Sequence, residues 1–226
     1  MSEIILDVET TGLSIQEDHR IVEIACIEIQ DLIPTKNIFY KLINPEREVS
    51  EEALKVHGYT NERLKKEKVF KEVADEFINF IEGKKLVAHN ATFDISFLNH
   101  ELKKIDKKTI DTKNVVDTLE IARSKYPGTS NSLDNLCKRF GIDISKREKH
   151  SALLDCELLR EVYINLLGQK EPTLIPANTS DALEDSNFNN DLTKKGSYSK
   201  IVIKPSIEEL EKHKKFIKEE QKKNYF

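Results

Sequence analysis

The hydrophobic pattern of this chain changes period partway along the sequence, and that change limits the folds open to it. Three apolar runs rich in β-branched residues come first, at residues 4–8, 20–29 and 38–43. The links between them are short: the first contains Thr11-Gly12, and the second is expected to span residues 31–37 and to include Pro34. Consecutive strands joined by short links are typical of an antiparallel meander.

From residue 69 onward, apolar residues recur with helical spacing. Val73, Phe77 and Ile81 share one face of a predicted helix at residues 69–81, which Gly83 ends. We then expect strands at 85–88 and 115–116, a helix around Phe93 and Phe97, and helices at 133–140 and 151–167. Three antiparallel strands followed by alternating helix and strand predict an α/β fold with a mixed sheet flanked by helices. This order is similar to the ribonuclease-H-like architecture.

The character of the chain changes after Gly168. Residues 170–199 are rich in Asn, Ser, Asp and Thr and predict a flexible linker. A short strand is expected at 200–204, followed by a charged helix that Ser206 caps, with Glu209 in the capping-box position. The apolar face of this helix is thin, consisting of Ile207, Leu210, Phe216 and Ile217. We therefore expect a folded domain at 1–169, a linker at 170–199 and a partner-binding tail at 200–226.

Charge and cysteine usage exclude some classes of protein. The formal net charge is −4, so no overall positive field draws the chain to nucleic acid, which disfavours a sequence-specific DNA reader. The three cysteines form no CxxC pair, which favours small buried residues in a reducing compartment. The chain opens on a strand rather than a signal peptide, and no apolar run approaches the roughly 18 residues of a membrane span. We expect a soluble, cytoplasmic protein with no membrane contact.

Acidic residues lie at the edges of several predicted core elements. Asp7 and Glu9 are two residues apart in a strand, so their carboxylates face the same way, a costly arrangement that cations relieve. A solvated edge strand explains that pair about equally well. Asp94 follows the strand at 85–88, where a sheet presents its carboxyl edge. For Asp94 alone, a favourable place in the first helical turn is the better explanation.

His150 and Asp155 form the last candidate pair. Five residues on a helix separate side chains by about 140°, so we expect His150 in the loop before the helix and Asp155 inside it. A single histidine is more often a surface or capping residue. An aspartate in an apolar helical stretch is harder to dismiss, because an unpaired carboxylate is costly to bury.

Taken together, the acids predict a metal site. Asp7, Glu9, Asp94 and Asp155 supply four carboxylates, the oxygen ligands that Mg²⁺ or Mn²⁺ prefers, and their charge balances two divalent ions. Two such ions about 3.5–4 Å apart can activate water and stabilise the leaving oxygen of a phosphodiester. His150 belongs to the pKa class suited to accept a proton from that water near neutral pH.

The motifs and their order resemble the DEDDh exonucleases. They are Asp7-x-Glu9-Thr10-Thr11-Gly12, His89-Asn90-x-x-Phe93-Asp94 and His150-x-x-x-x-Asp155. A sister group has Tyr where this chain has Ser151, so the His variant of the family applies. The resemblance implies a metal-dependent 3′→5′ exonuclease that releases 5′-monophosphates. It implies that the four acids bind the metals and that His150 is the general base. It also implies that Glu52 approaches the terminal 3′-OH and that His57 approaches the terminal nucleotide.

Within this family, the likeness extends over nearly the whole chain to the proofreading subunits of bacterial replicative DNA polymerases. It includes Val56-His57-Gly58, Phe70-x-x-Val73-Ala74-Asp75-Glu76-Phe77, Asn131-Ser132-Leu133-Asp134 and Lys200-Ile201-Val202. The resemblance implies that the substrate is a single-stranded or frayed DNA 3′ end. It also implies that the tail at 200–226 binds the alpha subunit of the polymerase. A sliding-clamp contact is implied only weakly, because the stretch that begins at Gln169 has Pro172 where the family has an aliphatic residue.

Two other interpretations remain open from the sequence. A DEDDh exoribonuclease that trims RNA 3′ ends would carry the same catalytic residues, because the metals contact phosphate rather than sugar. A non-catalytic assembly module of the polymerase would keep the fold but lose ligands. All five candidate residues, the four acids and His150, are present in this chain.

Overall fold

The structure is a computed structural model that describes residues 2–145, 147, 149–168 and 206–220. The chain divides into two units, Met1–Thr173 and Leu174–Phe226. The linker expected at 170–199, the strand expected at 200–204 and the clamp-like stretch at 169–174 lie outside the described residues. The boundaries expected for the three parts of the chain therefore stay a prediction.

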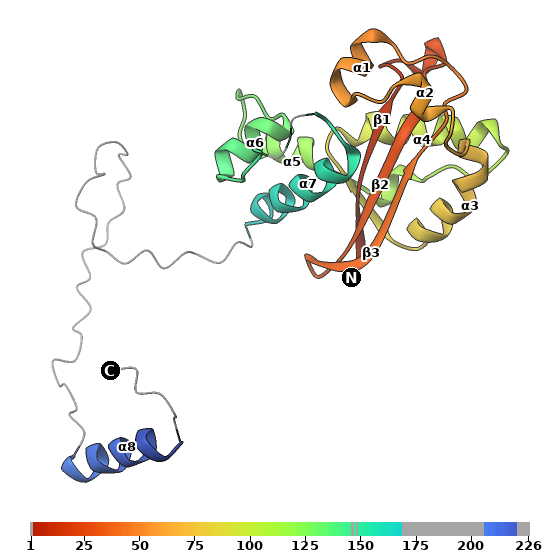
Figure 1. Ribbon diagram of the computed structural model, residues 1–226. Helices are drawn as coiled ribbons and strands as arrows, with labels where there is room; N and C mark the ends of the chain where they lie inside the picture. The colour runs from red at the N-terminus through yellow and green to blue at the C-terminus, as the bar shows by residue number, and fades with distance from the viewer. Residues whose placement is uncertain (1, 146, 148, 169–205, 221–226) are drawn as a thin grey trace. The chain divides into compact units, whose positions relative to one another are not determined.

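A five-stranded mixed sheet organises the first unit, with the strand order β3-β2-β1-β4-β5. Figure 1 labels the first three strands. Its strands are β1 (Ser2–Thr10), β2 (Ile21–Gln30), β3 (Ile33–Leu42), β4 (Lys85–Ala88) and β5 (Val115–Asp117). The first three pair in antiparallel fashion, whereas β4 runs parallel to β1 and β5 runs parallel to β4. The predicted mixed sheet is therefore confirmed.

The link between β2 and β3 is shorter than predicted. Only Asp31 and Leu32 separate the two strands, and both adopt positive φ values of 49° and 67°. Pro34, expected in the link, pairs with Ile29 inside β3. Because β3 is an edge strand, the missing N–H of Pro34 can be accommodated there. A proline therefore lies inside a strand here and does not mark a loop.

Helices complete the first unit. Those expected from the hydrophobic pattern are α3 (Phe70–Ile81), α4 (Ala91–Lys104), α6 (Leu133–Phe140) and α7 (Ala152–Leu166). The short helix α1 (Glu51–His57) has Ser50 as its N-cap and ends at Gly58. Not expected were α2 (Asn61–Leu64), α5 (Thr118–Lys125) and the 3-10 turns η1 (Ile15–Glu17) and η2 (Thr112–Asn114). α2 and the two 3-10 turns are too short to show a hydrophobic period, and α5 has few apolar residues, Leu119, Ile121 and Ala122.

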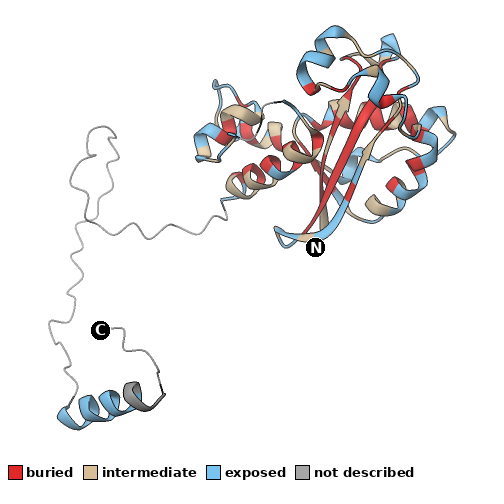
Figure 2. Ribbon diagram, in the orientation of Figure 1, coloured by how far each residue is buried: buried red, intermediate tan, exposed pale blue. Residues whose placement is uncertain are grey.

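The sheet is covered on both faces. Ile4, Leu6 and Val8 of β1 pack into one cluster with residues of α3 and α4, and Ile5 packs into another with residues of α7. Figure 2 shows β2 as buried along nearly its whole length. Because side chains alternate along β1, Asp7 and Glu9 lie on the same face as Ile5. The α7 face of the sheet therefore carries the acids. All three cysteines are buried and free, as predicted.

The second unit contains α8 (Ile207–Glu220). The predicted capping box is present: the Ser206 amide donates to Glu209 Oε2 at 2.7 Å, and the Glu209 amide donates to Ser206 Oγ at 3.2 Å. Leu210 and Phe216 are exposed. Across the described ranges of both units, no helix has the length and apolar character needed to cross a bilayer.

Candidate active site

β1 extends beyond its parallel partner and carries the first two acids. Its pairing with β4 stops at Ile5, opposite Val87, so the end of β1 that holds Asp7 and Glu9 faces other elements. Burial, then the nearby carboxylates of Asp94 and Asp155, raise the pKa of Asp7 well above its usual value. Burial, followed by repulsion from Asp155, raises the pKa of Glu9 to about 7. Four like charges are thus held together.

The loop after β1 fixes its end. Thr11 Oγ1 lies 2.9 Å from His19 Nδ1, and the Arg20 amide donates to the same hydroxyl at 3.0 Å. Gly12 is required because a Cβ there would lie 2.3 Å from Cε1 of the His19 ring. The close approach of the buried His19 imidazole therefore explains why Thr11 and Gly12 are needed in this loop.

Asp94 lies in the first turn of α4 and is 3% exposed. Its Oδ1 accepts a hydrogen bond from the Val8 amide at 3.1 Å, which joins α4 to the free end of β1. Burial raises the pKa of Asp94 to about 8, although this hydrogen bond lowers it. Asp94 thus lies in the first helical turn, and its burial and its bond to Val8 go beyond what the helix dipole alone requires.

His89, in the same motif, is a structural residue. Its Nδ1 lies 2.8 Å from Thr118 Oγ1, and its Nε2 lies 2.9 Å from the Asn131 carbonyl oxygen. Both ring nitrogens are therefore occupied. The imidazole ties the end of β4 to α5 and to the loop before α6.

His150 and Asp155 meet as the spacing predicts. His150 lies in the loop before α7 with a half-exposed side chain, and Asp155 is buried in the first turn of that helix. His150 Nδ1 is 3.4 Å from Asp155 Oδ2, and a hydrogen bond with Asp155 raises the pKa of His150. Ligand atoms of Glu9, His150 and Asp155 all lie within 4.8 Å of one another. Two elements far apart in the sequence therefore form one site.

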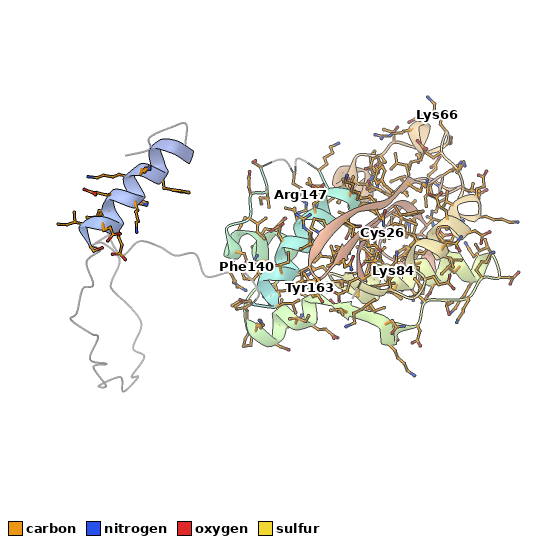
Figure 3. All side chains as sticks on the ribbon, turned by 90° about the horizontal axis from the view of Figure 1, so that it is seen from below. Cys26, Lys66, Lys84, Phe140, Arg147 and Tyr163 are labelled. Carbon is orange, nitrogen blue, oxygen red and sulfur yellow. The ribbon has the colours of Figure 1, made fainter. Side chains whose placement is uncertain are left out.

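Arg147 is a site residue that the sequence did not reveal. It lies beside α7 (Figure 3) and donates to both oxygens of Asp155, Nε to Oδ1 and Nη2 to Oδ2, each at 2.7 Å. Its Nη1 donates to Asp134, and its Nη2 lies 2.7 Å from His150 Nδ1. The loop before α7 has no hydrophobic period, so no signal from spacing singles out this arginine.

Glu52 and His57 line a pocket of about 710 Å³ that also includes Glu9, Leu13 and Phe93. His57 Nδ1 accepts from the Tyr59 amide at 3.0 Å, and its Nε2 is buried with no hydrogen-bond partner among the described residues. Burial lowers the pKa of His57 to about 4, so the ring is neutral near pH 7. The structure therefore brings both residues to the edge of the acid cluster, while their individual roles stay a prediction.

The donor set fits a hard divalent cation. Asp7, Glu9, Asp94 and Asp155 converge, and the first three have raised pKa values because their charges are buried together. Oxygen-rich sites of this kind suit Mg²⁺ or Mn²⁺, and a bound dication would offset the repulsion.

The sheet topology and the carboxylate set together define an exonuclease of the DEDDh class. A family model described as "Exonuclease" matches residues 4–163. DNA polymerase III subunit epsilon of Rickettsia conorii is 46% identical over 220 residues, which cover 96% of this chain and 95% of that protein. The same subunit of Pasteurella multocida is 39% identical, over 93% of this chain and 86% of that protein. The chain belongs to the exonuclease family and, within it, to the epsilon subunits of DNA polymerase III.

Solved structures agree on the fold. Exonuclease X in complex with 5′-overhanging duplex DNA matches with a TM-score of 0.58 and 26% identity, covering 75% of this chain and 93% of that one. The nuclease domain of 3′hExo, a DEDDh family member bound to rAMP, matches with a TM-score of 0.65 and 18% identity over 74% of this chain and 92% of that one. The second likeness concerns the fold alone. Family and fold imply dependence on divalent metal.

Proposed function

We propose that this chain is the proofreading 3′→5′ exonuclease subunit of a bacterial DNA polymerase III, and that it removes mispaired 3′-terminal nucleotides as 5′-monophosphates. The observation that carries this proposal is the convergence of carboxylates from β1, α4 and α7 beside one pocket. The names of the relatives favour this function over RNA trimming and over a non-catalytic assembly role.

Asp7, Glu9, Asp94 and Asp155 would hold two ions of Mg²⁺ or Mn²⁺. When bound, such a pair lowers the pKa of a water molecule and stabilises the leaving oxygen of an in-line phosphodiester displacement. Asp94 would be kept in place by its hydrogen bond from the Val8 amide. The burial and mutual repulsion of these acids support the assignment, because carboxylates gathered at such a cost need a cationic ligand.

His150 would accept the proton of the attacking water. Its half-exposed ring lies at the rim of the site, within reach of solvent, while its backbone amide donates to the Val56 carbonyl oxygen at 3.1 Å. The loop is thereby tied to α1, which forms a wall of the pocket. From this position, the imidazole of His150 can accept a proton from a water molecule held near Glu9 and Asp155.

The pocket would hold the terminal nucleotide. Leu13, Val56 and Phe93 offer apolar surface for a base, with Glu52 near the 3′-OH and His57 near the sugar or base. Selectivity for mispairs would come from fraying, because a mispaired end costs less to unstack than a paired one. Discrimination between paired and mispaired ends would therefore depend more on how easily the DNA end frays than on contacts in the pocket.

The tail at 200–226 would bind the polymerase alpha subunit. The exposed Leu210 and Phe216 on α8 support this role, since a helix with so thin an apolar face gains its stability from a partner. If residues 170–199 are flexible, they span on the order of 30 Å and hold the nuclease at a local concentration on the order of mM. A sliding-clamp contact is not part of this proposal, because Pro172 stands where the family has an aliphatic residue.

Hydrolysis of matched and mismatched primer–template DNA tests the proposal. We expect release of 5′-mononucleotides from the 3′ end in Mg²⁺ or Mn²⁺, faster at the mismatched end, and no release in EDTA. Equal or faster degradation of an RNA oligonucleotide of the same sequence would favour RNA trimming instead. Activity that persists unchanged in EDTA would remove the metal mechanism.

A further inference from the structure

Glu23 is a fully buried carboxylate that the metal site does not use. It is the third residue of β2 and lies directly opposite Glu9 in the β1–β2 register. Oε1 accepts from the Tyr59 hydroxyl at 2.9 Å and from Ser151 Oγ at 3.1 Å, and Oε2 accepts from the Ala152 amide at 2.9 Å. A buried carboxylate is stable only where hydrogen-bond donors surround it, and these three donors meet that need for Glu23.

The donors from α7 have no local alternative. The first amides of a helix lack partners within it, and a side chain at the N-cap usually accepts from them. Ser151 is the N-cap of α7, yet its side chain makes no such bond within the helix. Glu23, from β2, accepts from the first amide of α7 in place of the N-cap side chain. The helix dipole favours a carboxylate at this position. The start of α7 is therefore fixed by β2.

The third donor belongs to the pocket wall. Tyr59 follows α1 directly, and its ring stacks on His57 with centroids 5.1 Å apart and planes 23° apart. Gly58 packs closely against the Lys149 side chain: a Cβ on Gly58 would lie only 2.7 Å from the Lys149 Cδ. Lys149, before His150, thus contacts the segment that ends α1, and Ser151, after it, shares Glu23 Oε1 with Tyr59.

We propose that Glu23 is a positioning residue that fixes the His150 loop relative to the nucleotide pocket by holding the start of α7 and Tyr59 at once. The inference rests on the proposed roles of His150 and the pocket. Glu23 holds these groups by hydrogen bonds and is not one of the four proposed metal ligands, although its charge is near enough to raise the pKa of Asp7 and of Glu9. Its loss should therefore displace the base without removing a metal ligand. A misplacement of about 1 Å at such a site can lower the rate roughly 100-fold.

A double-mutant cycle separates this role from a merely structural one. We expect Glu23→Ala to lower kcat on single-stranded DNA about 10- to 100-fold in the wild-type background. In the His150→Ala background, the same change should lower kcat less than about twofold, because the displaced group is already gone. An equal loss in both backgrounds would overturn the proposal, as would an unchanged kcat for Glu23→Ala.

Controls keep the test decisive. Glu28→Ala removes another buried acid of β2, whose partners Ser2, Thr35, Asn37 and Lys84 lie away from the site, and should lower stability without changing kcat. Should Glu23→Ala fail to fold, Tyr59→Phe and Ser151→Ala each remove one donor while leaving the buried acid with others. Each should lower kcat in the wild-type background only, and additivity with His150→Ala would count against the proposal.

A readout independent of activity distinguishes this inference from the proposed function. Hydrogen exchange at the Ala152 amide should be slow in the full-length wild-type chain and at least tenfold faster in Glu23→Ala, with Glu28→Ala unchanged. If the chain hydrolyses no 3′ end but this pattern holds, the proposed function fails while the anchoring of α7 stands. If Ala152 exchanges equally fast in wild type and Glu23→Ala, the anchoring itself is wrong.

Discussion

Arg147 places its guanidinium against the carboxylate of Asp155 in a two-pronged contact, with Nε and Nη2 each 2.7 Å from a carboxylate oxygen. Both side chains are nearly inaccessible, at 7% and 5% exposure. The arginine thus supplies positive charge to the same carboxylate that would hold a metal ion. Its contacts with Asp134 and His150 extend this charge pairing across the loop before α7.

The first prediction concerns Arg147→Met. Without metal, the variant leaves Asp155 buried beside other acids, and breaking a buried pair typically costs about 3–5 kcal/mol. A bound divalent ion would compensate for the lost cation. Saturating Mn²⁺ should therefore raise Tm more in the variant than in the wild type. The same increase in both proteins would show that the arginine and the metal do not share Asp155.

Arg139→Met is the matched control for that experiment. Arg139 lies on α6, where it donates to Asn131 and Thr129 and stacks over Tyr126, away from the acids. Its loss should lower Tm in the presence and absence of Mn²⁺ alike.

The second prediction is that Asp7→Asn separates stability from activity. Burial and the carboxylates of Asp94, Asp155 and Glu9 raise the pKa of Asp7, so its charge destabilises the metal-free fold. Replacing it with a neutral amide should leave the free energy of unfolding in EDTA unchanged or higher. Hydrolysis should fall by orders of magnitude. Urea unfolding and nucleotide release measure the two effects, and robust hydrolysis by the variant in Mg²⁺ would contradict the proposed metal ligand.

Much of the site followed from simple periodicity. The two-residue spacing of Asp7 and Glu9 on a β-branched strand placed their carboxylates on one face, and the run at Lys85–Ala88 was recognisable as a buried strand. Because five residues on a helix separate side chains by about 140°, the spacing predicts His150 outside the helix that holds Asp155, and the structure confirms this. These inferences worked because each depends on neighbours in the sequence.

The features that were missed depend on distant contacts. In the sequence, Glu23 is one polar residue within an apolar strand. Its role depends on hydrogen bonds from Tyr59 and Ser151, which are distant along the chain. Arg147 gains its role from Asp134 and Asp155 in two different helices. Pro34 lies in β3 and not in the predicted link, because strand pairing at a sheet edge, rather than local preference, determines its place. No pattern within a short window encodes such relationships.

The third prediction concerns pH and metal together. The pKa of Glu9 rises from 4.5 to about 7 on folding, and that of Asp94 from 3.8 to about 8, chiefly because of burial. A carboxyl with a raised folded-state pKa binds protons more tightly when folded, so its contribution to stability is full below the unfolded value and is lost as pH rises. In EDTA, the free energy of unfolding should therefore fall between about pH 4 and pH 8.

Metal should reverse part of that trend. Carboxylates bind divalent ions in the deprotonated form, so Mg²⁺ affinity and kcat/KM should both rise through the same pH range. Unfolding followed by circular dichroism, with EDTA and with saturating Mg²⁺, gives two pH profiles that diverge as pH increases. Parallel profiles would mean that these acids do not bind the metal.

The fourth prediction tests the tail. Deleting residues 200–226 should abolish co-purification with the polymerase alpha subunit and leave hydrolysis of free single-stranded DNA unchanged. The paired substitution Leu210→Asp with Phe216→Asp should do the same, because it places charge on the exposed apolar positions of α8. Lys212→Ala, which removes a fully solvated ion pair with Glu208 on that helix, should preserve binding. Retention of the alpha subunit by the truncated chain would move the polymerase contact to residues 1–199.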